Sequence, residues 1–438
     1  MGRELTRASA GAVGVRAVGA VFGFLFNVLL ARSLGREGTG AVMFYLNFAT
    51  MTGLLATGGM DVVGLREISR QGADPPGAEC VFGHILSNAL LSALLFSLGG
   101  WIFLFFFGGR LSGIHSQWIF ATSVIILFLT AFQKSFSDWL IALHDLAASQ
   151  LTFYFINRVA AVALLFAVMI SAGAAGESKT AFIVIYAAGL FLAVLYAVRR
   201  IFARFPWRTI LPRLRPSAPL FRDGISCGMQ NAGFVALGLS PFILLGALSN
   251  ISELGSFAVS QRLVALMVLV LTTISQFAMR DFALAYADRD IAALSEALTA
   301  SVRLTFVSAV GIAIPLAILA PFWLLLFGRA FAGAAPVLAL LSLGICAQCL
   351  GMPFQSALLA THHERTARNV TFVCAAAGIA LNLLLIPRWG AEGAALGTGI
   401  GLALQSLGHA ARVLKLLPVR FDVTRWQIVP ESAEAGSL

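Results

Sequence analysis

Five ionisable side chains lie within long apolar runs of this sequence, where a charge needs a chemical or structural reason. They are Arg16, Lys134, Asp138, Arg158 and Arg262. A charged side chain at the centre of a bilayer costs about 3 kcal/mol on insertion scales, so such residues commonly pair or bind a ligand. The set carries three positive charges in excess. This balance favours a phosphate or another anion over a cationic ligand.

Each of these residues also has a structural alternative. Arg16 lies about one turn into its run, and Arg262 lies near the start of its own, at the end predicted to face outside, so either side chain can extend to the membrane interface. Arg158 lies deeper in its run, and contact with a substrate is favoured there. Lys134 and Asp138 share one helical face, so they either neutralise each other or form a pair that opens for an anion or a proton.

A second carboxylate and several amides complete the candidate site. Asp61, at the inner end of the second run, is either an ion-coupling residue together with Asp138 or a helix-end carboxylate. Uncharged amides bind sugar hydroxyls, and they also hydrogen-bond neighbouring helices within membranes. The amides of interest are Asn27, Asn47, Gln230, Asn231, Gln261 and Gln276. The predicted substrate-binding residues are Arg16, Arg262, Arg158, Lys134, Asn27, Asn47, Asn231 and Gln261, and the predicted ion-coupling residues are Asp138 and Asp61.

Motifs for enzyme chemistry do not account for this chain. A phosphate-binding loop with its lysine and an HExxH metal site are both missing from the sequence. Cys346 and Cys349 have the spacing of a redox or metal pair, but no histidine or acidic residue lies nearby, so packing is favoured. Gly393, Gly397 and Gly401 form a GxxxGxxxG ridge typical of close helix packing. We therefore expect a protein that is not an enzyme and that has no cofactor and no metal site.

The rest of the sequence predicts the elements that position these residues. Of the 438 residues, 59% are hydrophobic and 11% are charged, whereas an ordinary soluble domain has about 25% charged residues. A soluble enzyme, a secreted disulfide scaffold and a disordered chain are excluded. Apolar runs of about 20 residues, long enough to cross a bilayer as helices, predict an all-α integral membrane protein with about twelve transmembrane helices. These runs are 12–31, 41–61, 82–107, 117–140, 150–172, 180–198, 224–247, 257–278, 304–327, 336–360, 370–387 and 391–411.

The basic residues of the connectors predict the orientation of the chain. Connectors on the side of the N-terminus hold 20 of the 30 lysine and arginine residues, and those on the other side hold six. Because positive charge accumulates on the cytoplasmic side, we predict a multi-pass inner-membrane protein with both termini in the cytoplasm. The net charge of +10 then reflects orientation, and no nucleic-acid partner is expected. The short outer connectors also leave little room for a catalytic domain.

The longest connector predicts the domain organisation. Residues 199–223 contain seven arginines and divide the chain almost in half. We predict an N-terminal six-helix lobe over 1–198, a cytoplasmic linker over 199–223, a C-terminal six-helix lobe over 224–417 and a cytoplasmic tail over 418–438. The stretch 140–144 matches 358–362 weakly, at nearly the same offset as a second match between the halves. Such duplication is a recurrent plan of transporters, with the substrate site between the repeats.

Three stretches resemble the Wzx-like polysaccharide repeat-unit flippases of the MATE-like (MOP) exporter superfamily. They are LLARSLGREGTG at 29–40, GMDVVGLREI at 59–68 and LNLLLIPRWGAEGAA at 381–395, the last being the most specific. The resemblance implies two pseudo-symmetric six-helix lobes around a central cavity, lined mainly by the first, second, seventh and eighth spans. Arg16 and Arg262 fall on these spans, whereas Lys134 and Arg158 fall on the fourth and fifth.

The same resemblance implies a function. The expected substrate is an oligosaccharide on undecaprenyl pyrophosphate, moved from the inner to the outer leaflet by alternating access and driven by a proton or sodium gradient. Other membrane proteins of polysaccharide assembly are expected partners. One alternative is a drug or metabolite/cation antiporter of the same superfamily, which needs acidic residues deep in the lobes, where only Asp138 qualifies. Another is a membrane-bound polysaccharide polymerase or glycosyltransferase, which usually carries its catalytic site on a large loop.

Overall fold

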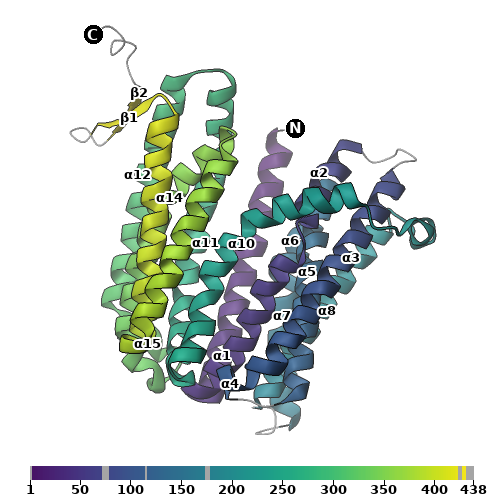
Figure 1. Cartoon of the computed structure of the whole chain (residues 1–438), viewed down its shortest axis with the longest axis vertical. Helices are drawn as coiled ribbons and strands as arrows, with labels where there is room; N and C mark the ends of the chain where they lie inside the picture. Colours follow the sequence, from purple (N-terminus) through teal and green to yellow (C-terminus); the bar gives the residue numbers. More distant parts are fainter. Residues whose placement is uncertain (1, 72–77, 114–115, 173–177, 423–426, 431–438) are drawn as a thin grey trace. The chain divides into compact units, whose positions relative to one another are not determined.

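The computed structural model describes residues 2–71, 78–113, 116–172, 178–422 and 427–430, which form helices joined by turns and loops, with a short hairpin near the C-terminus (Figure 1). The chain divides into two compact units, Met1–Gly255 and Ser256–Leu438. The first unit holds α1 (Gly2–Ala56), α2 (Met60–Gln71), α3 (Ala78–Phe103), α4 (Gly109–Ser112), α5 (Gln117–Ala142), α6 (Leu146–Gln150), α7 (Asn157–Ala172), α8 (Lys179–Phe202), α9 (Trp207–Ile210) and α10 (Ala218–Leu248). The second unit holds most of α11 (Ile251–Ala287), then α12 (Ile291–Ile318), α13 (Ala320–Leu325), α14 (Ala335–Ala360), α15 (Glu364–Leu416), β1 (Val419–Asp422) and β2 (Gln427–Pro430).

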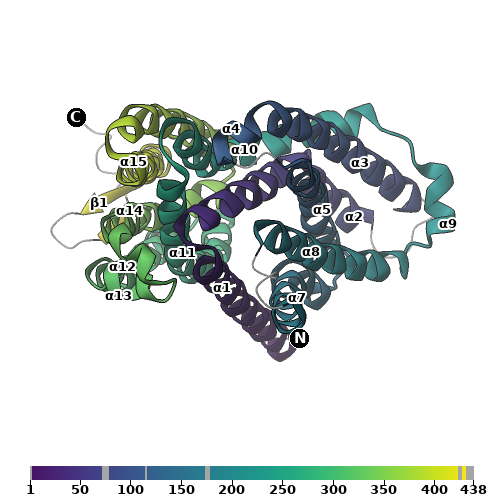
Figure 2. The ribbon, with the colours of Figure 1, turned by 90° about the horizontal axis from the view of Figure 1, so that it is seen from below.

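The described helices agree with the prediction of about twelve membrane spans. Nine of them are long and apolar enough to cross a membrane, or ten when the bent pair Ala218–Met229 and Ala232–Leu248 counts as one span. The helices α1 and α15 each contain one glycine with non-helical backbone angles, Gly35 (φ 65°, ψ −169°) and Gly390 (φ 51°, ψ −126°). The stretch on either side of each glycine is about the length that a bilayer requires. Figure 2 shows the two halves of α1 running in different directions.

The two halves of α15 form an antiparallel pair within the second unit. Asn382 donates a hydrogen bond to the Thr398 hydroxyl at 3.3 Å, and Gln405 donates to the Thr371 hydroxyl at 3.0 Å. A Cβ atom at Gly401 would lie 2.9 Å from the Cα atom of Gly378. The glycine ridge therefore allows the backbones to approach closely, and the predicted packing role is confirmed.

Small residues also join helices within the first unit. A Cβ atom at Gly53 would lie 2.7 Å from Cβ of Thr130, which places α1 directly against α5. Trp139 on α5 is fully buried and donates a hydrogen bond to the Met60 carbonyl at 2.9 Å. A Cβ atom at Gly64 would overlap the Trp139 indole. These contacts hold the start of α2 against the second half of α5, the half that is predicted to face the cytoplasm. They also position the carboxylate of Asp61, which lies in the first turn of α2.

The predicted linker 199–223 packs against α3 of the first unit. Arg213 Nη1 lies 2.5 Å from Glu79 Oε2, and His84 Nδ1 lies 2.6 Å from the Arg215 carbonyl oxygen. The boundary between the compact units falls at Gly255, within α11. The first turn of α11 stays with the first unit because Gly255 and Gly40 bring the two backbones into contact. The division into two six-helix lobes at 199–223 remains a prediction.

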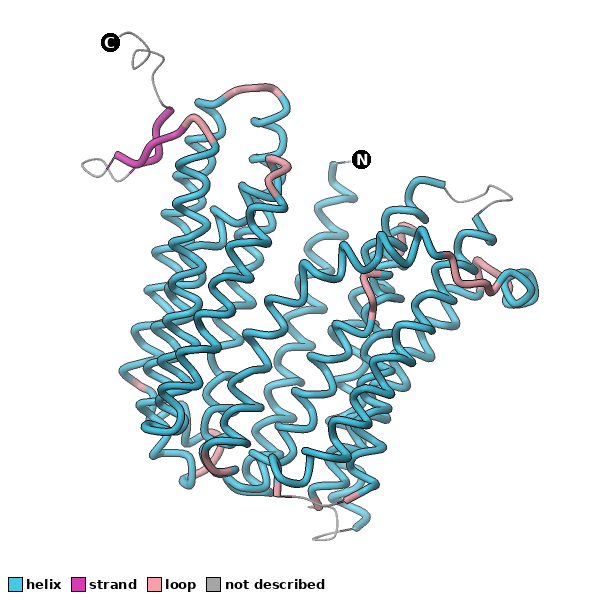
Figure 3. Tube along the Cα trace, in the orientation of Figure 1, coloured by secondary structure: helices cyan, strands magenta, loops and turns pink. Residues whose placement is uncertain are grey.

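The short hairpin packs on one end of the second unit. Strands β1 and β2 pair antiparallel, with Phe421 opposite Ile428, and Figure 3 shows them as the magenta segments. Ile428 joins an apolar cluster with Phe282, Leu298 and Val413 from α11, α12 and α15. The hairpin therefore ties together the ends of three helices that are far apart in sequence.

Candidate polar site in the first unit

Lys134 lies between two carboxylates in the first unit. Its ammonium group bonds to Asp138 one turn further along α5, and it lies 3.6 Å from Asp61 Oδ2 on α2. Asp61 is 1% exposed, and its Oδ1 atom has no hydrogen-bond partner among the described residues. Asp61 also lies in the first turn of α2, where a helix stabilises negative charge. The three side chains form a triad, defined as Lys134, Asp61 and Asp138, with one net negative charge.

A second group of side chains in the first unit consists of two arginines in contact with one tyrosine, Tyr154. Arg16 on α1 donates from Nε to Gln150 Oε1 at 2.6 Å, and its guanidinium carbon lies 4.9 Å from the centroid of the Tyr154 ring. Arg158 on α7 lies 5.6 Å from the same centroid and donates to the Tyr154 carbonyl at 3.1 Å. Cations are attracted to the face of an aromatic ring. The Tyr154 ring therefore attracts both guanidinium groups.

The backbone around Tyr154 departs from regular α-helix. Residues Leu151–Ile156 form a π-helical turn that continues α6 into α7. Such turns insert one extra residue into a helix and are frequent at functional sites. Sequence reasoning did not select Tyr154 or Gln150. The spacing of Tyr154 four residues before Arg158 is a signal that points to contact on one helical face, but the π-helical turn cannot be read from the sequence.

A polar pocket of about 130 Å³ lies beside Arg158. Arg158 is the one charged residue in its lining, and Gln133 on α5 is held there by a 2.8 Å hydrogen bond to the Thr152 carbonyl. The aliphatic part of Arg158 packs against α1, since a Cβ atom at Gly23 would lie 3.0 Å from Arg158 Cδ. The lining residues are Thr50, Met51, Leu54, Thr130, Gln133, Phe153, Asn157, Arg158 and Tyr186. This pocket offers hydrogen-bond donors and one positive charge.

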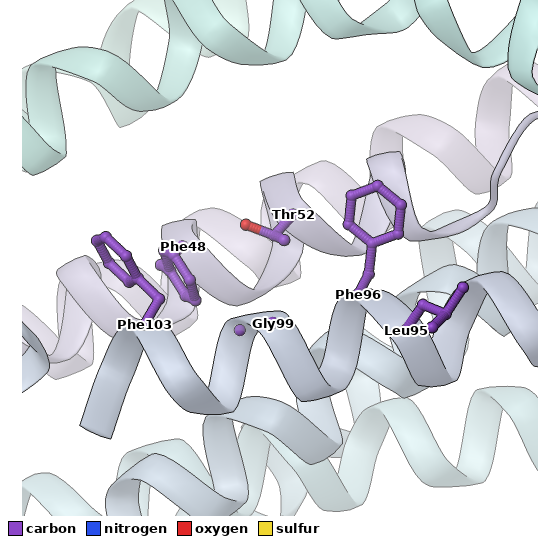
Figure 4. Close-up of a pocket in the computed structure, with 7 residues that line it drawn as sticks. Phe48, Thr52, Leu95, Phe96, Gly99 and Phe103 are labelled. Carbon is purple, nitrogen blue, oxygen red and sulfur yellow. The ribbon is translucent and has the colours of Figure 1, made fainter. Parts of the chain in front are cut away.

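A larger pocket of about 420 Å³ is almost entirely apolar. It lies between the second half of α1 and α3, and its lining consists of Phe48, Thr52, Leu95, Phe96, Gly99, Gly100 and Phe103. Figure 4 shows the Phe48 and Phe103 rings beside each other at one end, with Phe96 at the other. Those two rings stack with centroids 5.1 Å apart. Such a lining suits a hydrocarbon chain and offers nothing for a phosphate.

The remaining predicted residues do not join this cluster within the described structure. Asn27 donates to the Gly23 carbonyl at 2.6 Å and Asn47 donates to the Met43 carbonyl at 2.8 Å, each within its own helix. Gln261 and Arg262 lie on α11 in the second unit. Asn231 lies on α10, and its side chain falls outside the described part of the chain, as do those of Gln230 and Gln276. The structure thus brings together five of the predicted residues: Arg16, Asp61, Lys134, Asp138 and Arg158.

Other chemical motifs prove to be parts of helices. Cys346 and Cys349 lie on α14 as free cysteines, and the described residues contain no group of three side chains that could hold a metal ion. The stretch Gly224–Gly228 matches the GxSxG pattern, but it lies within α10. A nucleophile elbow needs a strand-to-helix turn. A Cβ atom at Gly228 would lie 3.2 Å from the Gly59 amide nitrogen, so close packing explains the glycines there.

The fold is that of a multi-pass helical membrane protein, and solved transporters of the MOP superfamily share it. An inward-facing multidrug resistance MATE family transporter of the MOP superfamily superposes with a TM-score of 0.73 at 15% identity, over 92% of this chain and 98% of the other. The lipid II flippase MurJ, in an inward closed conformation, superposes with a TM-score of 0.70 at 12% identity, over 91% and 86%. A MOP superfamily transporter from Pyrococcus furiosus gives 0.62 at 15% identity, over 92% and 95%.

The family is shown by the sequence itself. Residues 11–279, more than half of the chain, match the sequence profile of a protein family described as 'polysaccharide biosynthesis protein'. The chain belongs to this family, the Wzx-like flippase family, which comprises transporters rather than enzymes. No curated protein matches the sequence at a significant level.

Proposed function

We propose that the protein flips an oligosaccharide repeat unit, carried on undecaprenyl pyrophosphate, from the inner to the outer leaflet of the cytoplasmic membrane by alternating access. Membership of the polysaccharide biosynthesis family supports the class of cargo. In this proposal both termini lie in the cytoplasm, as the connectors predict. The bilayer carries the prenyl chain, and the partners are other membrane proteins of polysaccharide assembly.

The observation that carries the proposal is the gathering of cations in the first unit. Arg16, Arg158 and Lys134 outnumber the carboxylates of Asp61 and Asp138 by one charge. A guanidinium group offers parallel N–H donors that match a phosphate. Arg16 is oriented by the neutral Gln150 side chain and the Tyr154 ring. It is the residue that binds the pyrophosphate in this proposal, and Arg262 on α11 is the second ligand.

The other predicted residues take different parts in the proposal. Lys134 is held by its two carboxylates, and Arg158 faces a pocket of about 130 Å³, which is too small for a repeat unit. Neither is therefore the group that contacts the pyrophosphate in this proposal. The amides Asn27, Asn47, Asn231 and Gln261 are the candidates for binding sugar hydroxyls.

The triad supplies the proposed ion coupling. It carries one net negative charge, and Asp61 Oδ1 has no hydrogen-bond partner among the described residues. A proton on Asp61 cancels this charge, weakens the attraction to Lys134 and leaves the Lys134–Asp138 pair neutral. Asp61→Asn mimics the protonated state. We expect this variant to flip substrate independently of the proton gradient, as measured in proteoliposomes with and without an imposed pH difference.

The main test replaces Arg16 and Arg262 with alanine, singly and together. The double variant should leave lipid-linked repeat units on the cytoplasmic face, measured by their accessibility to a soluble enzyme that cleaves sugars. Arg110→Ala on α4 is the matched control, because Arg110 is exposed at the end of a helix. Normal surface polysaccharide in a double variant that is present at wild-type levels would overturn the proposal.

A drug or metabolite/cation antiporter is the second candidate. Burial of Asp61 beside Asp138 favours it, because a cationic ligand needs acidic groups within a lobe. Overexpression should then confer resistance to cationic dyes, and Asp138→Asn should abolish that resistance. Dye resistance without accumulation of lipid-linked intermediates in a deletion strain would decide for the antiporter.

A further inference from the structure

The polar pocket beside Arg158 has a positive charge that its own lining does not balance. Arg158 interacts with the Tyr154 carbonyl and the Tyr154 ring, both of which are neutral. No carboxylate lines the pocket, and within the described ranges Arg158 makes no ion pair. Asp61 and Asp138 of the same unit are paired with Lys134. A cation removed from water is costly unless a counter-charge accompanies it.

Two neutral side chains in the lining have groups available for a ligand. Asn157 is 5% exposed, and its Oδ1 atom has no hydrogen-bond partner in the described structure. Its Oδ1 atom lies on the side of α8, since a Cβ atom at Gly189 would lie 2.8 Å from it. The NH₂ group of the same amide is therefore available to the pocket that Asn157 lines. The Tyr186 hydroxyl likewise has no hydrogen bond to another described residue. Both groups can donate to an anion beside Arg158.

The other hydroxyl groups in the lining are already used. Thr50 donates to the Leu46 carbonyl and Thr130 donates to the Ile126 carbonyl, each at 2.7 Å within its own helix. The arrangement therefore selects three donors, those of Arg158, Asn157 and Tyr186. Donors of this kind around a single positive charge suit an anion and not a cation.

We infer that this pocket binds a small inorganic anion such as chloride, held by Arg158, Asn157 and Tyr186. A volume of about 130 Å³ is well above what a single water molecule needs, so the pocket admits chloride together with water. The anion neutralises Arg158 where it packs against Gly23 of α1. It therefore stabilises the contact between α1 and α7. This site is independent of the pyrophosphate binding proposed for Arg16.

The test measures thermal unfolding of the full-length protein in detergent as sodium chloride replaces sodium gluconate. The sodium concentration and the ionic strength stay constant, and sodium bromide serves as a second probe. A specific site raises the unfolding temperature in a saturable way, since a ligand that binds only the folded state stabilises it. Arg158→Gln should remove this dependence, whereas Arg16→Gln should retain it. No chloride dependence in the wild type, or an equal dependence in Arg158→Gln, would overturn the inference.

Two further variants keep the test decisive if Arg158→Gln does not fold. Asn157→Asp places a carboxylate in the pocket, so the protein should fold and lose its response to chloride. Tyr186→Phe removes one donor and should weaken the apparent chloride affinity by about fivefold, the usual effect of one hydrogen bond. A full chloride response in Asn157→Asp would contradict the inference. Bromide soaked into crystals should give an anomalous peak beside Arg158. Bromide peaks at other places, with none beside Arg158, would also overturn the inference.

Discussion

The two pockets of the first unit use opposite faces of one stretch of α1. Phe48 and Thr52, four residues apart, line the apolar pocket, whereas Thr50 and Leu54, also four apart, line the polar one on the opposite face, with Met51 at its edge. Residues four apart share a face of a helix, and residues two apart do not. About two turns of helix therefore carry both a surface suited to hydrocarbon and a surface suited to charge.

The two pockets are also built differently. The apolar pocket needs only α1 and α3, whereas the polar pocket takes residues from α1, α5, the π-helical turn, α7 and α8. An apolar wall in a membrane needs no hydrogen-bond partners, but every polar group must find one. The polar side is therefore a network in which each residue depends on several elements. Substitutions on the polar side should cost more than those on the apolar side.

The largest effect is expected from Lys134→Met on the polar side. This change leaves the carboxylates of Asp61 and Asp138 without their shared cation. Removing one partner of a buried ion pair lowers the free energy of unfolding by about 3 kcal/mol. Thermal unfolding in detergent measures the loss. Adding Asp61→Asn and Asp138→Asn to Lys134→Met should restore much of it, and a loss below about 1 kcal/mol for the single variant would show that the triad is not a network.

A second test compares two glycines, one at the contact between α1 and α5 and one in the lining of the apolar pocket. Gly53→Ala places a methyl group 2.7 Å from Cβ of Thr130, and Gly99→Ala places one where nothing lies within 4 Å. Overpacking costs about 2 kcal/mol, so Gly53→Ala should destabilise the protein and Gly99→Ala should not. Unfolding temperatures of the two variants give the comparison. Equal values would mean that α1 and α5 can separate without cost.

A smaller effect is expected for Phe103→Ala in the apolar pocket. The stacked pair with Phe48 contributes about 1 kcal/mol beyond area burial, and lipid chains can replace part of the lost contact. The unfolding temperature should fall only slightly. Phe106→Ala is the control, because Phe106 is 63% exposed. A loss above about 3 kcal/mol for Phe103→Ala would place this pocket in a tightly packed core.

The smallest effect is expected for Thr52→Val. Thr52 supplies the one polar side chain of the apolar pocket, and valine has nearly the same shape. The free energy of unfolding should change by less than about 0.5 kcal/mol, as for most substitutions outside special contacts. Flipping should be unaffected in the same variant. A marked loss of transport with unchanged stability would assign the Thr52 hydroxyl a contact with substrate.

The membrane spans could be predicted from the sequence because an apolar run of about 20 residues is enough to identify each one. It also predicted the Lys134–Asp138 contact, since four residues along a helix is a local relation. Asp61 was placed at a helix end but not beside Lys134, because that contact depends on the packing of Gly64 against Trp139. Tyr154 was missed altogether. Its contact with two arginines arises from a π-helical turn and from the approach of α1, neither of which has a local sequence pattern.

The C-terminal hairpin has a consequence for association between molecules. The Thr299 hydroxyl on α12 accepts from the Ile428 amide at 2.9 Å and lies 3.2 Å from the Ile428 carbonyl oxygen. A two-stranded sheet exposes backbone groups along its edges, and such edges recruit strands from other chains. Here one side chain takes the place of a neighbouring strand at Ile428. The same contact that anchors the hairpin thus occupies the backbone groups of Ile428 that an added strand would need.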